Sequence, residues 1–165
     1  MSKLATSFSQ QLKDAFLGLH AFNCCDTTSS FAGKGKIKPL KIMKSDNHFI
    51  KVFARLGTAE NISVEDQDTL EHFVCCLYGK PTQRSVNKIR HNKVREKFSA
   101  RKSVLSNTDG LELSKMPPCK QVLTLHMERA NYQSIIWRKA ITNNPDIPNP
   151  GTSGWIEDSG FLKIK

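Results

Sequence analysis

The sequence predicts a mainly α-helical fold, with one helical domain and a short C-terminal tail that ends in a β-hairpin. Three observations support this prediction. Apolar side chains recur at intervals of three and four over most of the 165 residues, which is typical of amphipathic helices. Residues that favour helix starts and helix ends stand at the borders of these stretches. Near the C-terminus, a proline-rich segment precedes two short apolar runs that flank a turn.

The first half of the chain contains three expected helices. Apolar periodicity predicts a helix around residues 8–22. A lysine-rich helix is expected after the glycines of segment 33–35. Asn47 is expected to cap the next helix, which ends at Gly57.

The second half of the helical region has equally clear borders. The pattern at Ser63 resembles a capping box and opens a helix that ends at Gly79. Ser85 is expected to start another helix. Pro117–Pro118 stands where the longest helix would begin. Apolar residues continue from there to Ala140, which corresponds to about 23 residues or roughly 35 Å of helix.

Two segments lack helical periodicity and are expected to be linkers. Residues 103–115 contain turn-forming residues, and residues 143–153 contain three prolines, so the second segment should be extended. The runs 155–156 and 161–164 then flank a turn, as the two strands of a hairpin do.

These borders divide the chain into a helical domain, residues 1–142, and a proline-rich tail, residues 143–165. Within the helical domain, residues 1–57 contain a Gly-Lys-Gly segment, residues 58–102 contain an acidic and then a basic helix, and residues 117–142 contain the longest helix.

The charge of the chain favours a polyanionic partner. Lys and Arg number 25 against 15 Asp and Glu, which gives a net charge of +10. The net charge is +6 in residues 1–57 and +7 in residues 81–102, whereas the residues between them, 58–80, carry −4. A polyanion site is therefore expected in the two basic blocks.

The composition argues against a membrane span and against secretion. The longest apolar run, Val74–Tyr78, has about five residues, far fewer than a membrane span needs. The N-terminal residues Met1–Leu4 do not begin an apolar signal core. The odd number of cysteines, five, favours reduced thiols. We therefore expect a nuclear or cytoplasmic protein that does not engage a membrane.

The segment from Leu17 to Lys41 carries the first candidate site. Asp26 is followed by four hydroxyl-bearing residues, so this turn is rich in oxygen ligands. Glycines permit positive φ, and backbone amides beside lysines suit a phosphate. The predicted nucleic-acid-binding residues of this segment are Gly33, Lys34, Gly35, Lys36, Lys38 and Lys41. In the simpler alternative, Asp26 only caps a helix and the lysines form a solvated face.

The second candidate site is a basic helix that starts after Ser85. Its basic residues form a broad stripe along the helix, which would bind phosphates. Only one aromatic residue, Phe98, lies among them. That scarcity argues against a protein that stacks the bases of a single strand. The alternatives are a solvated face and a nuclear-targeting patch. The predicted phosphate-binding residues here are Arg84, Lys88, Arg90, Lys93, Arg95, Lys97, Arg101 and Lys102.

Several stretches resemble a known family. The segment LHAFNCCDTTSSFAGKGK resembles the pattern HAF-T-GCDTTS-x-F-x-GKGK of a large mobile-element-associated family. The later motifs of that family resemble LEHFVCCLYGK, SVNKIR, MPPCKQVLTLHMERANYQSIIWRKA and PDIPNPGTSGW. Together these matches cover roughly residues 15–160. The GCD part of the pattern is in turn similar to a segment of PIN-like nucleases of the flap endonuclease group.

The resemblance implies the helical C-terminal portion of a PIN-like nuclease fold. Asp26 matches an aspartate that helps to hold a divalent metal ion in those nucleases. The resemblance therefore implies that Mg²⁺ or Mn²⁺ binds at Asp26 only if the remaining ligands are supplied from elsewhere, and no cofactor is otherwise required. Gly33, Lys34 and Gly35 match a helical hairpin that contacts the DNA backbone there.

The chain departs from the family pattern in ways that weaken the expectation of catalysis. Cys24 stands where the family has glycine, and Asn23 stands where it usually has threonine, which affects the turn that aims Asp26. In such nucleases most of the carboxylates come from an α/β part that would precede Leu17, where this chain has one acid, Asp14. The cysteine-rich C-terminal tail of the family is also missing. We therefore expect a truncated copy. Its apolar N-terminal face would be covered either by a second copy, in a homodimer, or by the missing N-terminal domain.

Three hypotheses follow. The leading one is a nucleic-acid-binding helical module that contacts phosphates and is a non-catalytic, truncated remnant of a PIN-like nuclease. The second is a divalent-metal-dependent 5′ nuclease, with Asp26 as one ligand, completed by an absent domain or a partner chain. The third is an interaction protein or gene remnant without a role in nucleic-acid binding.

Overall fold

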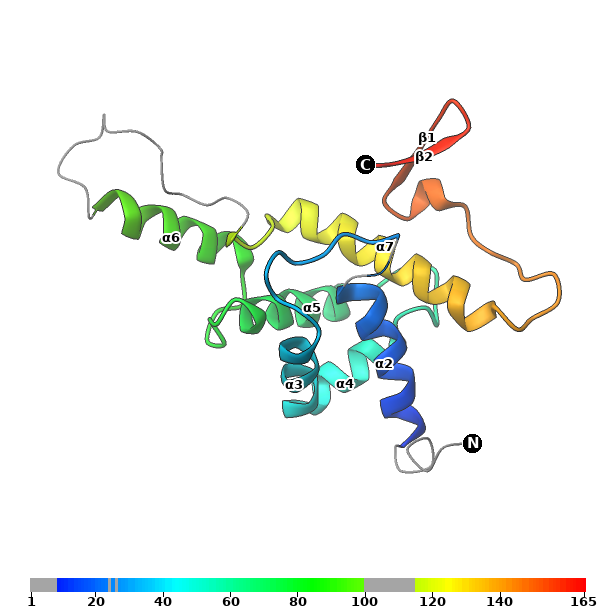
Figure 1. Cartoon of the computed structure of the whole chain (residues 1–165), viewed down its shortest axis with the longest axis horizontal. Coiled ribbons are helices and arrows are strands. Elements are labelled where there is room, and N and C mark those ends of the chain that lie inside the picture. The colour runs from blue at the N-terminus through cyan, green and yellow to red at the C-terminus, as the bar shows by residue number, and fades with distance from the viewer. Residues whose placement is uncertain (1–8, 24, 26, 100–114) are drawn as a thin grey trace.

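A computed structural model describes residues 9–23, 25, 27–99 and 115–165 (Figure 1). This part of the chain is mainly helical and ends in a two-stranded antiparallel hairpin, as the sequence predicts. The expected linker at 103–115 lies outside the described residues except for Lys115. The elements are α2 (Gln10–Asn23), α3 (Ile37–Ser45), α4 (Asn47–Arg55), α5 (Val64–Leu77), α6 (Val86–Ser99), α7 (Lys120–Lys139), the 3-10 turn η2 (Pro150–Thr152), β1 (Trp155–Asp158) and β2 (Phe161–Ile164).

Most helix borders follow from local chemistry. Ser63 caps α5, because its hydroxyl accepts a hydrogen bond from the Asp66 amide at 3.2 Å. Gly57 and Gly79 end α4 and α5 with φ of +79° and +76°, a conformation that costs glycine little.

The expected cap of α4 was wrong by one residue. Asp46 has an extended backbone and accepts a hydrogen bond from the His48 amide at 2.8 Å, whereas Asn47 is already helical. An aspartate in front of the first helical residue satisfies the same free amides that Asn47 was expected to satisfy.

The longest helix begins later than expected. We expected it to start at Pro117–Pro118, but α7 starts at Lys120 and has 20 residues. A proline disfavours the helical conformation of the residue before it, so Pro118 keeps Pro117 out of the helix. Instead, the Lys120 amide donates to the Asn87 side chain at 2.9 Å, which fixes the start of α7 against α6.

The core lies among α2, α4, α5 and one side of α7 (Figure 1). Phe22, Phe53 and Phe73 are fully buried, and the ring centroids of Phe53 and Phe73 are 4.8 Å apart in an edge-on arrangement. Gly18 permits α2 to approach α4 closely, because a Cβ at this position would stand 2.1 Å from the Phe53 carbonyl oxygen. These contacts make α2, α4 and α5 one packed unit.

The acidic residues of α5 bind other helices through charge. Arg55 of α4 forms a two-bond ion pair with Asp66. Glu71 is 5% exposed; it accepts a hydrogen bond from the Val86 amide at 2.9 Å and pairs with Lys120. Glu71 therefore ties α5 to the first residues of both α6 and α7.

The tail contacts α7 and then extends from it. Arg129 of α7 is buried and donates to the Gly154 carbonyl at 3.1 Å. The segment expected to be fully extended contains one 3-10 turn, Pro150–Thr152, which the Asn149 side chain caps. In the hairpin, Trp155 pairs with Ile164 and Asp158 with Phe161. None of the described helices has both the length and the apolarity that a membrane span requires.

Candidate nucleic-acid interface

The first basic segment forms an open turn in front of α3. Gly33 and Gly35 have φ of +68° and +57°, as their positions in the sequence suggested. A Cβ at either glycine would meet no atom within 4 Å, so the backbone of this turn is open to a ligand. Lys34 is half-buried, and the other predicted lysines of the segment are exposed: Lys36, Lys38 and Lys41.

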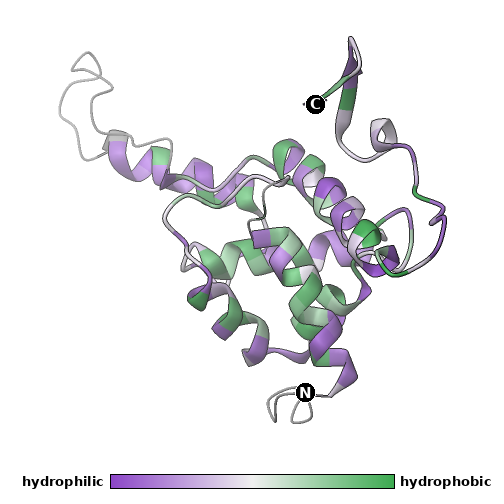
Figure 2. Cartoon of the chain, turned by 45° about the vertical axis from the view of Figure 1, so that its right-hand side comes forward, coloured by the Kyte–Doolittle hydropathy of each residue, from purple (hydrophilic) through white to green (hydrophobic). Residues whose placement is uncertain are grey.

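The second basic segment corresponds to α6 and the residues just before it. Only Val86 and Ile89 of this helix are buried among its described side chains, and the helix then extends away from the body of the molecule (Figure 1). Figure 2 shows its ribbon as mostly hydrophilic, in contrast to the helices of the core. Lys88 and Arg95 are exposed, while Lys93 and Lys97 are half-buried.

Two arginines of this segment have structural contacts. Arg84 donates to Nδ1 of His72 at 3.0 Å, and the opposite nitrogen of this ring donates to the Pro81 carbonyl at 2.9 Å. Arg90 donates to the Pro117 carbonyl at 2.6 Å. Arg101 and Lys102 lie outside the described residues.

The ring of Tyr78 joins the two basic segments. The Lys34 ammonium lies 4.1 Å from the centre of this ring, and the Lys93 ammonium lies 5.9 Å from it. Burial, together with the positive charges of Lys38 and Lys93, lowers the pKa of Lys34. Two lysines separated by 59 positions in the sequence therefore repel each other at one place, and a bound anion would relieve that repulsion.

A cleft of about 240 Å³ opens beside Tyr78. We call it the Tyr78 cleft. Its walls come from the turn before Gly33, the end of α5, the middle of α6 and the start of α7, with Ser29, Ser30, Phe31, Tyr78, Arg90, Met116, Pro117, Pro118, Val122 and His126 as its lining.

His126 forms the buried wall of this cleft. The side chain is 4% exposed, and burial lowers the pKa of its imidazole to about 4. Nε2 lies 2.7 Å from the Phe22 carbonyl oxygen, and Nδ1 lies 3.0 Å from the Ser29 hydroxyl. A carbonyl can only accept, so Nε2 carries the proton and Nδ1 accepts the hydrogen bond from Ser29.

This serine–histidine pair does not suit nucleophilic catalysis. A general base works best when its pKa is near the ambient pH. An imidazole with a pKa of about 4 is a weak base at neutral pH, and a backbone carbonyl stabilises an imidazolium less than a carboxylate would. The pair instead fixes the direction of the Ser29 hydroxyl.

The predicted metal ligand, Asp26, lies outside the described residues. The hydroxyl groups beside it bond to protein atoms: Thr27 donates to the Gln133 side chain, and Thr28 donates to the Ala21 carbonyl at 2.7 Å. Within the described ranges, no group of three or more His, Cys, Asp or Glu side chains is placed to hold a metal ion. The oxygen-rich turn thus uses two of its hydroxyl groups to dock on α7 and α2.

No family model, curated protein or solved structure matches this chain. The resemblance to PIN-like nucleases therefore stays a prediction from the sequence motifs. The geometry of the basic residues is the structural evidence that bears on function.

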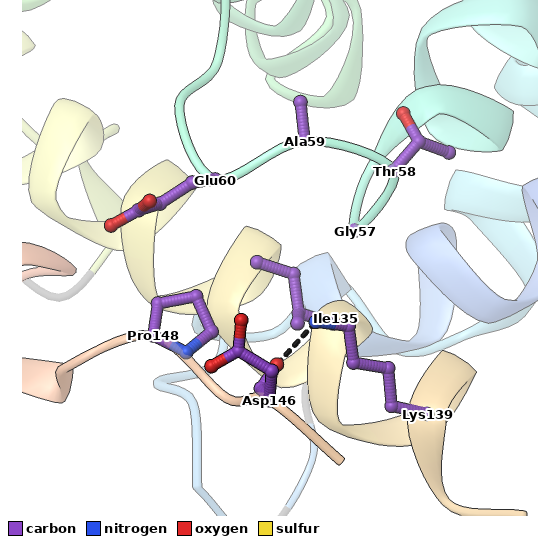
Figure 3. Close-up of a pocket in the computed structure, with 8 residues that line it drawn as sticks. All are labelled: Gly57, Thr58, Ala59, Glu60, Ile135, Lys139, Asp146 and Pro148. Carbon is purple, nitrogen blue, oxygen red and sulfur yellow. Dashed lines mark hydrogen bonds between the residues drawn. The ribbon is translucent and has the colours of Figure 1, made fainter. Parts of the chain in front are cut away.

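A second cleft lies on a different part of α7 and has another character. It has a volume of about 260 Å³, and residues 57–60, α7 and the tail line it (Figure 3). Figure 3 shows the Lys139 ammonium hydrogen-bonded to the backbone carbonyl of Asp146 at one end, with Glu60 at the opposite wall. Two carboxylates accompany one ammonium group there, so this cleft does not attract a polyanion as the lysines beside Tyr78 do.

Sequence reasoning identified the lysines but not the residues that gather them. Tyr78 was part of an apolar run, and His126 was one helical histidine among several. The only available signal was their place in the family-like motifs LYGK and HMERANYQ. The cleft itself has no sequence signal, because its walls come from four separate parts of the chain.

Proposed function

We propose that this protein is a nucleic-acid-binding helical module that contacts phosphates and has no catalytic activity of its own. The observation that carries the proposal is the convergence of Lys34 and Lys93 on the Tyr78 ring. Together with the open Gly33–Gly35 turn, they form one cationic surface from two separate basic segments. On the basis of the family-like motifs, we also propose descent from a PIN-like nuclease.

Backbone contact independent of base sequence is the expected binding mode. Lysines and arginines on an exposed helix reach phosphates readily, and free backbone amides add neutral donors. Lys34 and Lys93 meet at the centre of this surface. Lys36, Lys38, Lys88 and Arg95 are further exposed cations of the same two segments. Neutralising 6–8 phosphates would give a slope of about −5 to −7 in a plot of log affinity against log salt concentration.

The test measures the anisotropy of a labelled DNA duplex and of a flap-bearing DNA at several salt concentrations. The double variant Lys34→Ala/Lys93→Ala removes the two converging charges and should reduce the magnitude of the salt slope by about 2. The matched control is Lys13→Ala/Lys51→Ala, which removes the same charge from the exposed surfaces of α2 and α4. The control should leave the slope and the affinity nearly unchanged.

Two outcomes would overturn the proposal. If the protein binds neither DNA with a steep salt dependence, the interaction-protein hypothesis becomes the better account. If Mg²⁺ or Mn²⁺ leads to cleavage products on a gel, and Asp26→Ala abolishes them, the chain is a nuclease. Salt-dependent binding with intact DNA, lost selectively in the Lys34/Lys93 variant, supports the proposal.

A further inference from the structure

The lining of the Tyr78 cleft differs from the cationic surface beside it. Met116, Pro117, Pro118, Val122 and Phe31 supply apolar walls. The volume of about 240 Å³ is smaller than the 300–1,000 Å³ that is usual for drug-sized ligands. A flat, partly apolar group of the size of one ring system therefore fits this cleft better than a hydrated phosphate does.

The hydroxyl group of Ser29 in the lining of the cleft has a fixed orientation. Because Nδ1 of His126 accepts a hydrogen bond from the Ser29 hydroxyl, the oxygen of Ser29 retains lone pairs that can accept another. Ser29 is exposed and lines the cleft, so it presents an acceptor to a group that enters. Every nucleobase carries N–H donors on its Watson–Crick edge, but pairing in a duplex hides them.

The cleft and the cationic surface share one residue. Tyr78 lines the cleft, and its ring also lies beneath the ammonium groups of Lys34 and Lys93. A strand whose phosphates lie on these lysines would therefore carry its bases past the mouth of the cleft. Arg90 also lines the cleft and donates to the Pro117 carbonyl, so it adds positive charge near the same place.

We propose that the Tyr78 cleft receives one unpaired nucleobase of a strand whose phosphates lie on Lys34 and Lys93. The module then prefers single-stranded nucleic acid, including the free strand of a flap, over an uninterrupted duplex. This inference rests on the proposed phosphate-binding function and names its ligand more closely. It reverses the expectation from the scarcity of aromatic residues in the basic helix, because the walls of the cleft come from other parts of the chain.

The test compares two strands of equal charge. One is a 15-nucleotide single-stranded DNA of mixed sequence, and the other has the same phosphates but an abasic tetrahydrofuran unit at every position. The base-bearing strand should bind about tenfold more tightly, in line with the contribution of one well-seated base. It should also bind more tightly than a 15-base-pair duplex, although the higher charge density of the duplex favours the duplex on electrostatic grounds.

A variant of the cleft wall makes the test specific. Val122 is 52% exposed on α7, so Val122→Gln extends a neutral polar side chain into the cleft without disturbing the core. This variant should lose most of the difference between the base-bearing and abasic strands. Val64→Gln is the matched control, because Val64 is 74% exposed at the start of α5 and does not line the cleft. It should retain the difference.

The outcomes separate this inference from the proposed function. Equal, steeply salt-dependent binding of the base-bearing and abasic strands would overturn the cleft inference and leave phosphate binding intact. An equal loss of the difference in both valine variants would also overturn it. Absence of salt-dependent binding to any of these nucleic acids would overturn both.

Discussion

Helices α5 and α6 have the same length, 14 residues, and follow each other in the chain, but they have opposite roles. Eight residues of α5 are buried, whereas in α6 only Val86 and Ile89 are buried among the described side chains. The two helices also differ in charge. Acidic side chains of α5 pair with α4 and α7, whereas α6 carries basic side chains, of which Lys88 and Arg95 are exposed.

The difference shows which helix the fold needs and which helix is available for binding. Most of the stability of a helix in a protein comes from the packing of its apolar face. The packing of α5 therefore stabilises the domain, while α6 contributes its buried residues near the N-terminal end and presents its lysines. Within the described residues, the basic side chains of α6 form no ion pair, and this surplus of positive charge is tolerated because little of the helix enters the core.

The largest expected effect tests the role of α5 in the core. Phe73→Ala removes a fully buried ring that contacts Phe53 and Phe22, so it should lower the free energy of unfolding by about 3–5 kcal/mol. Val94→Ala in α6 should change it by less than about 1 kcal/mol, because Val94 lies outside the buried core. Urea unfolding of both variants measures the contrast, and equal costs would contradict it.

The second largest effect tests whether His126, in the wall of the Tyr78 cleft, is as shielded from water as the core residues of α5. His126 has a pKa of about 4 in the folded protein because it is buried, against about 6.5 in an unfolded chain. The unfolded state therefore binds more protons between these values. Stability from this group is present above pH 6.5 and is lost as the pH falls towards 4, by about 3 kcal/mol in all.

This pH effect is measured by urea unfolding between pH 7 and pH 4, as the difference between the wild-type protein and His126→Gln. The subtraction removes the contribution of carboxylates that titrate in the same range. Titration of the His126 ring by NMR provides an independent check. A midpoint near 6.5 in the folded protein would show that the cleft wall is hydrated.

The smallest effect concerns the buried charge by which α5 holds the start of α7. Glu71→Gln keeps an acceptor for the Val86 amide but removes the charge that pairs with Lys120. We expect a cost of about 2 kcal/mol, below the range for fully buried pairs, because the Lys120 side chain is 35% exposed.

Asp68→Asn is the matched control for the Glu71 variant, since this carboxylate is 69% exposed and lies 3.5 Å from the same ammonium group. Exposed pairs contribute little, so the control should change stability by less than about 1 kcal/mol. Equal effects of the two variants in thermal or urea unfolding would show that the charge of Glu71 does not join α5 to α7.

The sequence predicted those features that depend on neighbouring residues. Ser63 caps its helix as expected, because a cap forms between residues three positions apart. The glycines at 33 and 35 adopt positive φ, since this is a local property of the backbone. Even the misplaced cap, Asp46 in place of Asn47, differs by one residue between two good capping types.

The candidate site could be predicted only in part. The lysines were visible as two charge blocks, but nothing in either block indicated that they meet. The roles of Thr27 and Thr28 were also hidden, because their partners are Gln133, 106 positions away, and the Ala21 carbonyl. Hydroxyl groups suggested metal ligands in the sequence, and in the fold these two are hydrogen-bond donors to protein oxygen atoms.

By itself, the sequence determined the helical class, most helix borders, the terminal hairpin and the separation of acidic from basic segments. These properties depend on side-chain periodicity, capping and composition, which act over a few residues. Only the tertiary structure decided that Lys34 and Lys93 share the Tyr78 ring and that Ser29 meets His126 across 97 positions. The reason is that the burial of α2, α4 and α5 against one another sets where distant residues lie, and no local pattern records that packing.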